Sequence, residues 1–547
     1  MKMEKKIWII LTVGVILLIG TTFAWWYWNS TTNTNISLTI NGVEVTYVQG
    51  EDITGVNLIP VSSKEKGVAD NTAIEKVVTA SATTNVNNFN LYLTLETLPN
   101  GLKDKSFVYE VYNGANLVGK GNFANYNQGD KIKIANAQNI TSTTTSFQIY
   151  IWIDGNIDNP DTMMNQTFKF VLSADATDQD PSFQTLTKLG VNLNTTVSAD
   201  NINFNKMPYM TTEQAETNLN FTCSTIYGTA DVSTCLSENF GLSTKEEWIN
   251  KYVSQVDDNG VFAMQDDLGT SYYYRGNVEN NYVNFAGNYW RIIRINGDGT
   301  IRMIYDGPTK KHNGALGEDN IAFESPYNSS YNDNTYVGYM YGATSSDYTN
   351  THSNTNDSKI KTNIDGWYED TIITGGYDKY IADAIYCNDR KVVTGTYWGQ
   401  SFTGDGTGTN ASAYAPLQRI TSASPSLICN QANDKFSVTS IGNGDLTYPV
   451  ALLTIDEAVM GGISIPNLAN NIFPVNTYSY LSMNYWYWTM GPVVFDGGGA
   501  RVWRVGDGIA GVAGVSRSDG VRPVVSLKSD ITFTGTGTYD NPFEISG

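Results

Sequence analysis

The sequence predicts a mainly β protein with an α+β C-terminal part. Charged residues make up only 16% of the 547 residues while aromatic residues reach 12%, which is typical of β-rich surface proteins rather than of helical enzymes. Apolar residues alternate with polar ones along many short segments, as they do in half-buried antiparallel strands. Asn-Gly turns and Gly-rich loops recur between these segments. A chain of this length should contain two to four domains of roughly 150 residues each.

Residues 1–28 have the features of an export signal. Basic residues precede an apolar run from Ile7 to Gly20, and the sequence Thr22-Phe23-Ala24 leads into Trp25-Trp26-Tyr27-Trp28. A signal peptidase would cleave after Ala24. Retention as a membrane anchor is the alternative, because about 20 apolar residues cross a bilayer and the aromatic cluster would lie at its outer interface. In both cases the remaining chain is expected at the cell envelope, outside the cytoplasm, either secreted or held by a single membrane pass.

Residues 29–176 are predicted to form a β-sandwich. Apolar side chains alternate on both sides of Asn41-Gly42, which predicts a hairpin with a type I′ turn. The alternation from Phe107 to Val111 runs into a second such pair, Asn113-Gly114. Leu91, Leu93 and Leu95 share one face of a further strand. Several half-buried antiparallel strands of this kind make a sandwich.

This stretch is similar to the camelysin and TasA family of exported biofilm-matrix proteins. The resemblance covers roughly residues 5–176 and includes the processing region Gly20-Thr21-Thr22-Phe23-Ala24-Trp25. It implies a sandwich subunit that a dedicated signal peptidase processes. Self-assembly of the sandwich into a matrix or pilus-like fibre is therefore an alternative function.

Two less regular regions follow the sandwich. Residues 177–205 are polar and predict a linker with partial structure. Residues 206–280 predict a small α+β connecting region, in which Ser243-Thr244-Lys245-Glu246 is a capping box that begins a helix. A second capping box is Thr454-Ile455-Asp456-Glu457, and a further helix is predicted near Tyr377–Ala384.

Four cysteines remain in the exported part of the chain, and an even number there predicts disulfides. Three pairings are conceivable. We expect Cys223 with Cys235 and Cys387 with Cys429, because each cysteine then pairs with its nearest neighbour in the sequence. Free buried thiols and a zinc site are the alternatives, although no Cys-x-x-Cys spacing occurs and His312 and His352 are the only histidines.

The C-terminal residues 281–547 contain tryptophan-bearing strands. Trp290-Arg291-Ile292-Ile293-Arg294-Ile295 is followed by the turn Asn296-Gly297-Asp298-Gly299, which predicts a hairpin. The strands around Trp488 and Trp503 and the motif Gly520-Val521-Arg522-Pro523 follow towards the C-terminus. This region resembles a domain common in exported proteins of gut Firmicutes. That domain is related to the C-type-lectin-like fold of formylglycine-generating enzymes and variable receptor proteins.

The resemblance covers roughly Asn281 to Leu527 and implies a rigid scaffold whose loops bind a ligand, a surface glycan or a protein. It implies no catalysis, since the reactive cysteine pair of the formylglycine-generating activity has no counterpart. The candidate binding loops are Tyr485–Asp496 and Val505–Asp519. Aromatic anchors beside small adaptable residues suit recognition, although a tryptophan such as Trp503 is more often a core residue than a ligand contact. The predicted contacts are Trp486, Tyr487, Trp503, Arg504 and Asp507.

Calcium is the one cofactor for which the sequence offers candidate ligands. Asp154, Asn156, Asp158 and Asp161 place oxygen-bearing side chains at close spacing, and such side chains suit a hard cation. The segment lacks the bidentate glutamate of an EF-hand and contains Pro160. No other cofactor is expected.

Composition also argues against two classes of function. The net charge of −20 repels nucleic acid, and neither a Gly-x-Ser-x-Gly nor a His-Glu-x-x-His motif occurs, so we expect no enzyme. A hydrolase with two carboxylates distant in sequence is the weakest hypothesis. The sequence therefore predicts an exported cell-envelope binding or adhesion protein, with a structural fibre subunit as the alternative.

Overall fold

The computed structural model describes residues 35–40, 43–48, 58–82, 86–155, 163, 166–177, 180–314 and 320–546. The chain divides into two compact units, Met1–Asp180 and Pro181–Gly547. Strands contain 35% of the residues and helices 21%, which confirms the predicted mainly β fold class. The export segment and the Asn41-Gly42 turn lie outside the described residues. Within the described part, no helix is both long and apolar enough to cross a membrane.

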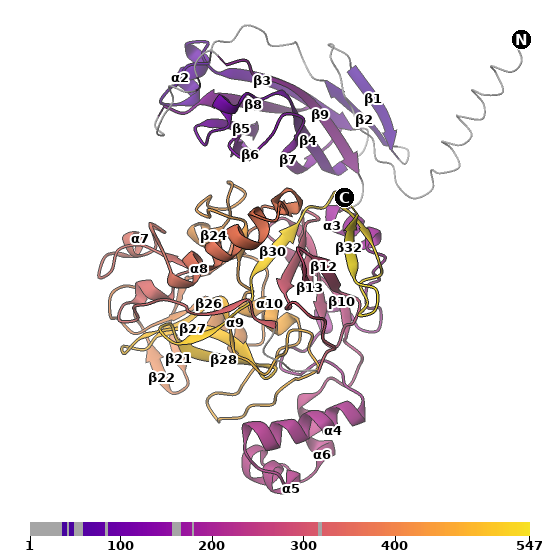
Figure 1. Ribbon diagram of the computed structural model, residues 1–547, viewed down its shortest axis with the longest axis vertical. Coiled ribbons are helices and arrows are strands. Elements are labelled where there is room, and N and C mark those ends of the chain that lie inside the picture. Colours follow the sequence, from indigo (N-terminus) through magenta and orange to yellow (C-terminus); the bar gives the residue numbers. More distant parts are fainter. Residues whose placement is uncertain are drawn as a thin grey trace, which may run out of the picture. The chain divides into compact units, whose positions relative to one another are not determined.

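The first unit contains two antiparallel sheets and a short helix, α2 (Lys64–Ala69). The strands are β1 (Asn35–Ile40), β2 (Val43–Val48), β3 (Ile74–Ala82), β4 (Val86–Thr97), β5 (Phe107–Asn113), β6 (Asn116–Asn122), β7 (Lys131–Ile140), β8 (Thr145–Ile153) and β9 (Lys169–Thr177). One sheet has the order β1-β2-β3-β8-β5-β6 and the other the order β7-β4-β9 (Figure 1).

Side chains from both sheets meet in one core, so the first unit is a β-sandwich. Leu91, Leu93 and Leu95 of β4 are fully buried there, together with Ile149 and Ile151 of β8. The alternation seen in the sequence thus points one face of each strand inward. Both predicted hairpins form. β1 pairs antiparallel with β2, and β5 turns into β6 through Gly114 and Ala115, one residue later than the predicted pair Asn113-Gly114. Gly114 has a φ of 61°, which a residue without a Cβ adopts at little cost.

The second unit contains two large sheets. The ten-stranded sheet consists of β10 (Gly260–Asp266), β11 (Gly269–Arg275), β12 (Tyr282–Phe285), β13 (Asn288–Ile295), β14 (Ile301–Tyr305), β18 (Ile381–Ala382), β25 (Val450–Ala451), β30 (Val524–Leu527), β31 (Thr532–Thr534) and β32 (Phe543–Ser546). The seven-stranded sheet consists of β15 (Phe323–Pro326), β20 (Val392–Val393), β23 (Ser412–Tyr414), β26 (Tyr487–Phe495), β27 (Ala500–Gly506), β28 (Ile509–Gly514) and β29 (Ser518–Val521).

Shorter elements complete the second unit. The helices are α3 (Pro181–Lys188), α4 (Thr212–Phe221), α5 (Val232–Cys235), α6 (Lys245–Tyr252), α7 (Tyr348–Thr351), α8 (Lys359–Tyr368), α9 (Ala415–Thr421) and α10 (Ile455–Met460). Three two-stranded ribbons pair β16 (Met340–Tyr341) with β17 (Asn356–Asp357), β19 (Tyr386–Cys387) with β24 (Lys435–Phe436), and β21 (Gly395–Tyr397) with β22 (Gln400–Phe402). The predicted hairpin is β13 and β14, joined by the Asn296–Gly299 turn.

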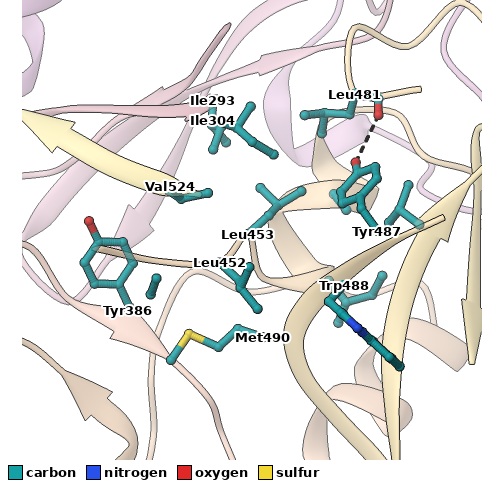
Figure 2. Close-up of a cluster of buried hydrophobic side chains, with 14 of the residues drawn as sticks. Ile293, Ile304, Tyr386, Leu452, Leu453, Leu481, Tyr487, Trp488, Met490 and Val524 are labelled. Carbon is teal, nitrogen blue, oxygen red and sulfur yellow. Dashed lines mark hydrogen bonds between the residues drawn. The ribbon is translucent and has the colours of Figure 1, made fainter. Parts of the chain in front are cut away.

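The main core of the second unit contains residues from both large sheets. Figure 2 shows Ile293 and Ile304 of the ten-stranded sheet near Leu453, with Tyr487 and Trp488 of β26 on the other side. All five side chains are at most 1% exposed. Their contacts join the two sheets into one hydrophobic core, which supplies most of the stability of the unit.

The predicted domain boundaries differ from the observed units. Residues 177–205 were expected to be a linker, yet they include α3, and Leu186 and Leu189 belong to the main core of the second unit. The predicted connecting region 206–280 is divided. Its helices α4, α5 and α6 lie together around a small core of their own (Figure 1), whereas β10 and β11 join the ten-stranded sheet. The region 281–547 therefore shares its sheet and its core with residues that precede it.

The three predicted helices have different outcomes in the structure. The capping box at Thr454 and Glu457 begins α10 as predicted. In α6 the box is one residue later than predicted, with Thr244 as the N-cap and Glu247 as its partner. The helix predicted at Tyr377–Ala384 is only a 3₁₀ turn at Asp378–Tyr380. Ile381 continues into β18 because it pairs with Leu527 of β30, a contact between residues distant in the sequence.

Both predicted disulfides are present. Cys223 pairs with Cys235 and Cys387 with Cys429, each with a Cα–Cα distance of 5.7 Å. The first joins the segment after α4 to α5, and the second joins β19 to the loop before β24. No free cysteine remains among the described residues, so the zinc and free-thiol alternatives are excluded.

Candidate functional site

The structure divides the five predicted contact residues into two groups. Tyr487 and Trp503 are 0% and 1% exposed. The Tyr487 hydroxyl donates a hydrogen bond to the carbonyl oxygen of Leu481 at 2.9 Å inside the core (Figure 2). Trp486, Arg504 and Asp507 are partly exposed instead. Neighbouring residues of a strand point to opposite faces of the sheet, so Arg504 lies on the face opposite Trp503.

Trp486 lies flat on the outer face of β27 and β28. A Cβ atom added to Gly506 would come within 2.5 Å of indole Cδ2, and one added to Gly511 within 2.4 Å of Cζ3. Only glycine at these two positions leaves room for the ring. The two strands pair antiparallel, with Arg504 opposite Gly511, so both glycines and Arg504 share this face. The backbone of the hairpin thus forms a rigid floor under the indole.

The guanidinium group of Arg504 stacks on the indole. Its Cζ lies 4.1 Å from the centroid of the Trp486 ring, which is cation–π geometry. Its Nη1 donates to both carboxylate oxygens of Asp519, at 3.2 and 3.1 Å, and Arg517 donates to the same carboxylate at 3.0 Å. Burial lowers the pKa of Arg504, and Asp519 opposes this shift. The Nε of Arg504 is buried and has no hydrogen-bond partner among the described residues.

Asp507 lies in the turn between β27 and β28. Its φ is 51°, in the left-handed region that is uncommon for residues with a side chain, although aspartate tolerates it better than most. Its backbone N–H donates to the carbonyl oxygen of Met483 at 2.7 Å and holds the turn. Burial raises the pKa of the Asp507 carboxyl, and Arg504 opposes this shift.

We call Trp486, Arg504, Asp507, Arg517 and Asp519 the Trp486 surface. It combines an aromatic plane with a carboxylate and an arginine Nε. Such a set of groups suits an amphipathic ligand, which can place an apolar group against the part of the indole that remains exposed and bond its polar groups to the charges.

Four further residues of this site lie within the predicted segment Val505–Asp519 but were not among the predicted contacts. Asp519 and Arg517 hold Arg504 in place, and Gly506 and Gly511 form the floor under the ring. Charged residues close together in a strand-rich segment, as in Arg517-Ser518-Asp519, were a usable signal of an ion pair. The glycines carried no such signal, because Gly is frequent throughout these loops.

The predicted calcium site stays a prediction. Asn156, Asp158 and Asp161 lie outside the described residues, and Asp154 lies directly after β8. In the described part of the chain, no group of three or more His, Cys, Asp or Glu side chains is placed to hold a metal ion. The hairpin turn Asn296–Gly299 also contains two oxygen-bearing side chains, but Asp298 there accepts hydrogen bonds from the backbone N–H and the hydroxyl of Thr300, which is ordinary hairpin chemistry.

Comparison with known proteins adds no further assignment. No protein-family model matches this chain, and no curated protein matches its sequence.

Proposed function

We propose that this chain is an exported cell-envelope binding or adhesion protein. In this proposal it recognises a surface glycan or protein ligand through the Trp486 surface, which a C-type-lectin-like scaffold displays. One observation carries the proposal. The Trp486 ring rests on Gly506 and Gly511 under the Arg504 guanidinium, in a unit whose inner face is fully packed.

Rigidity is the reason that this surface suits binding. A ligand that meets side chains already held in place orders few groups on association, and this raises the affinity that a given contact area can supply. Trp and Arg also supply most of the binding energy at typical recognition sites. Here the glycine floor holds Trp486, and the two ion pairs of Asp519 hold the arginines.

The two disulfides support the extracytoplasmic part of the proposal. Disulfides persist in oxidising compartments and are rare in the reducing cytosol, and this chain has two. Cleavage after Ala24 and retention of residues 1–28 as an anchor remain alternative forms of the proposal.

A binding array tests the proposal. The chain from Asn29 onward is applied to immobilised glycans and host-matrix proteins, with and without calcium. We expect a specific ligand whose binding is lost in Trp486→Ala and in Asp507→Asn. Asparagine keeps the size of the side chain and tolerates the left-handed backbone at this position, so the second variant tests the charge alone.

Trp367→Ala is the matched control. Trp367 is also partly buried, but it lies on α8 beside Trp290 and Tyr305, and its loss should leave binding unchanged. A silent array with folded protein, or equal binding by all three variants, would contradict the proposal.

The alternative, a fibre subunit, is favoured by the edge of the sandwich. β1 ends the six-stranded sheet and pairs only with β2 among the described strands. An open strand edge is a template for pairing with a second chain. Electron microscopy of the chain from Asn29 onward separates the two functions. Regular filaments would favour the fibre subunit, and persistent monomers at high concentration would exclude it.

A further inference from the structure

A second candidate site lies in the second unit, apart from the residues of the Trp486 surface. A small pocket, with a volume of about 40 Å³ below an open mouth, lies between the ten-stranded sheet, α9, α10 and the Cys387–Cys429 disulfide. A space of this size holds a few waters or the polar head of a small molecule whose remainder lies in the open mouth. Charged side chains that are almost fully buried line much of its wall.

Most of these charges are paired with each other. Arg294 donates to Asp266 at 2.7 Å and to Glu457 at 2.9 Å, and the Nε of Arg302 lies 2.9 Å from the same Glu457 oxygen. The pairs hold β13 and β14 to α10. Paired in this way, buried charges avoid most of the cost of leaving water.

A second group of charges surrounds Arg419 of α9. Its Nε and Nη2 donate to the two carboxylate oxygens of Asp456, at 2.7 and 2.9 Å, and its Nη1 donates to Oδ2 of Asp389. Arg419 thus keeps a bidentate pair with Asp456 even without Asp389. Asp389 accepts from Arg419 through Oδ2 alone.

Charge balance in the wall favours a cationic ligand. Five carboxylates line the pocket, namely Asp266, Asp267, Asp389, Asp456 and Glu457, together with three arginines. Lys435 adds a fourth cation by pairing with Asp267 at 2.9 Å. One carboxylate is therefore in excess, and a single positive charge in the pocket would balance it.

Two buried acceptor atoms in the wall have no donor. Oδ1 of Asp389 and Oδ1 of Asn296 have no hydrogen-bond partner among the described residues, and these residues are 1% and 3% exposed. A buried acceptor without a donor costs about 1–3 kcal/mol. Asp389 also has a φ of 46°. Strained backbone of this kind is concentrated at ligand sites, where the surrounding structure holds it in place.

We propose that this pocket binds a small primary ammonium compound, whose N–H groups donate to Asp389 and Asn296. An ammonium group supplies both things that the wall lacks, a positive charge and hydrogen-bond donors. A metal ion fits less well, because no group of three His, Cys, Asp or Glu side chains in the described residues is placed to hold one. The proposal does not depend on the function assigned to the Trp486 surface.

Calorimetry on the full chain tests the proposal. The probes are ethylammonium, butylammonium and lysine, with tetramethylammonium as a cation of similar charge that has no N–H donor. We expect at least one primary ammonium probe to bind and tetramethylammonium to bind at least about tenfold more weakly. Failure of all three primary ammonium probes, or equal binding of tetramethylammonium, would overturn the proposal.

Asp389→Asn removes the negative charge that the proposal pairs with the ammonium group. Asparagine has the same shape and tolerates the left-handed backbone, and Arg419 keeps both bonds to Asp456, so the fold should persist. The affinity for the probe should fall about tenfold or more. Asp365→Asn is the matched control, since Asp365 also pairs with a cation, Lys361, and has a buried Oδ1 without a donor but does not line the pocket. Equal binding by the Asp389 variant would overturn the assignment.

A second variant keeps the test decisive if Asp389→Asn fails to fold. Ser426 lines the pocket and is partly exposed, and its side chain belongs to none of the ion pairs. Ser426→Phe should fill the pocket and abolish binding of the probe while the Arg294 and Arg419 pairs stay intact. Unchanged probe affinity in this variant would show that the probe binds elsewhere.

Discussion

At the scale of single residues, burial separates side chains that hold the core from side chains that are able to bind. Trp486 and Trp503 look alike in the sequence, since both lie beside other aromatic or charged residues of short strands. Trp503 is 1% exposed and Trp486 is partly exposed. The cause is the direction of each side chain: Trp503 of β27 points into the core, whereas Trp486, which directly precedes β26, lies on the outer face of β27 and β28.

Trp503→Ala should therefore destabilise the protein far more than Trp486→Ala does. Deleting a fully buried tryptophan leaves a cavity and costs about 3–5 kcal/mol of unfolding free energy. Urea denaturation of both variants, followed by circular dichroism, measures this difference. Equal losses of stability would show that the Trp486 ring is as much a part of the core as Trp503.

His352 should make stability depend on pH. The ring is buried against Tyr348, and burial together with Arg390 lowers the pKa of His352 from 6.5 to about 4. The unfolded chain then binds a proton below pH 6.5, whereas the folded chain binds it only near pH 4. Stability from the neutral ring is thus fully present above pH 6.5 and lost as the pH falls towards 4.

His352→Gln removes this titration. The unfolding free energy of the wild type should fall relative to the variant by up to about 3 kcal/mol between pH 7 and pH 4. Urea denaturation of both proteins across this pH range is the measurement. A difference that does not change with pH would mean that His352 titrates alike in the folded and unfolded chain.

At the scale of elements, α10 shows how a local signal and a distant contact can involve the same residue. Glu457 completes the capping box with Thr454, and this much was predicted from the sequence. The same carboxylate also pairs with Arg294 and Arg302 from two strands of the ten-stranded sheet. Burial raises the pKa of Glu457, but the two arginines outweigh it and hold the pKa below its usual value.

Glu457→Gln should cost about 3–5 kcal/mol of unfolding free energy, because it leaves two buried arginines without their shared carboxylate. Glu247→Gln is the matched control, since Glu247 occupies the same position in the capping box of α6 but is exposed. The control should cost less than about 1 kcal/mol. Thermal or urea unfolding of the two variants provides the comparison. Similar losses would mean that the arginines contribute little.

Other elements show which structures a local sequence signal predicts and which it does not. Asn113-Gly114 predicted its hairpin because turn preferences are local, although the two turn residues are Gly114 and Ala115. The residues near Tyr377 were predicted as a helix, yet Ile381 pairs with Leu527 in a sheet. Pairing with a strand so distant in the sequence overrides the local helix propensity. The residues near Tyr377 alone therefore do not predict this strand.

At the scale of the whole molecule, the two disulfides constrain segments of different length. Cys387–Cys429 closes a separation of 42 residues and Cys223–Cys235 one of 12 residues. Replacing Cys387 and Cys429 by serine should cost about 4 kcal/mol, and replacing Cys223 and Cys235 about 3 kcal/mol, because the longer closed loop removes more entropy from the unfolded chain.

Differential scanning calorimetry of the two double variants measures these losses. Loss of Cys387–Cys429 should also weaken probe binding in the charged pocket, since Cys387 lines it. A larger loss of stability on removing Cys223–Cys235 would contradict the loop-length argument.

The sequence by itself determined the mainly β class, the sandwich, its hairpins, the capping box of α10 and both cysteine pairings. Each of these depends on residues near one another in the chain, where periodicity, turn geometry and spacing act directly. The tertiary structure alone decided that residues 181–205 belong to the second unit and that Tyr487 and Trp503 are core residues. It alone brought Asp389, Asn296 and the arginines of three elements around one pocket. Those placements arise from contacts between distant segments, and such contacts are set by how the sheets and helices pack.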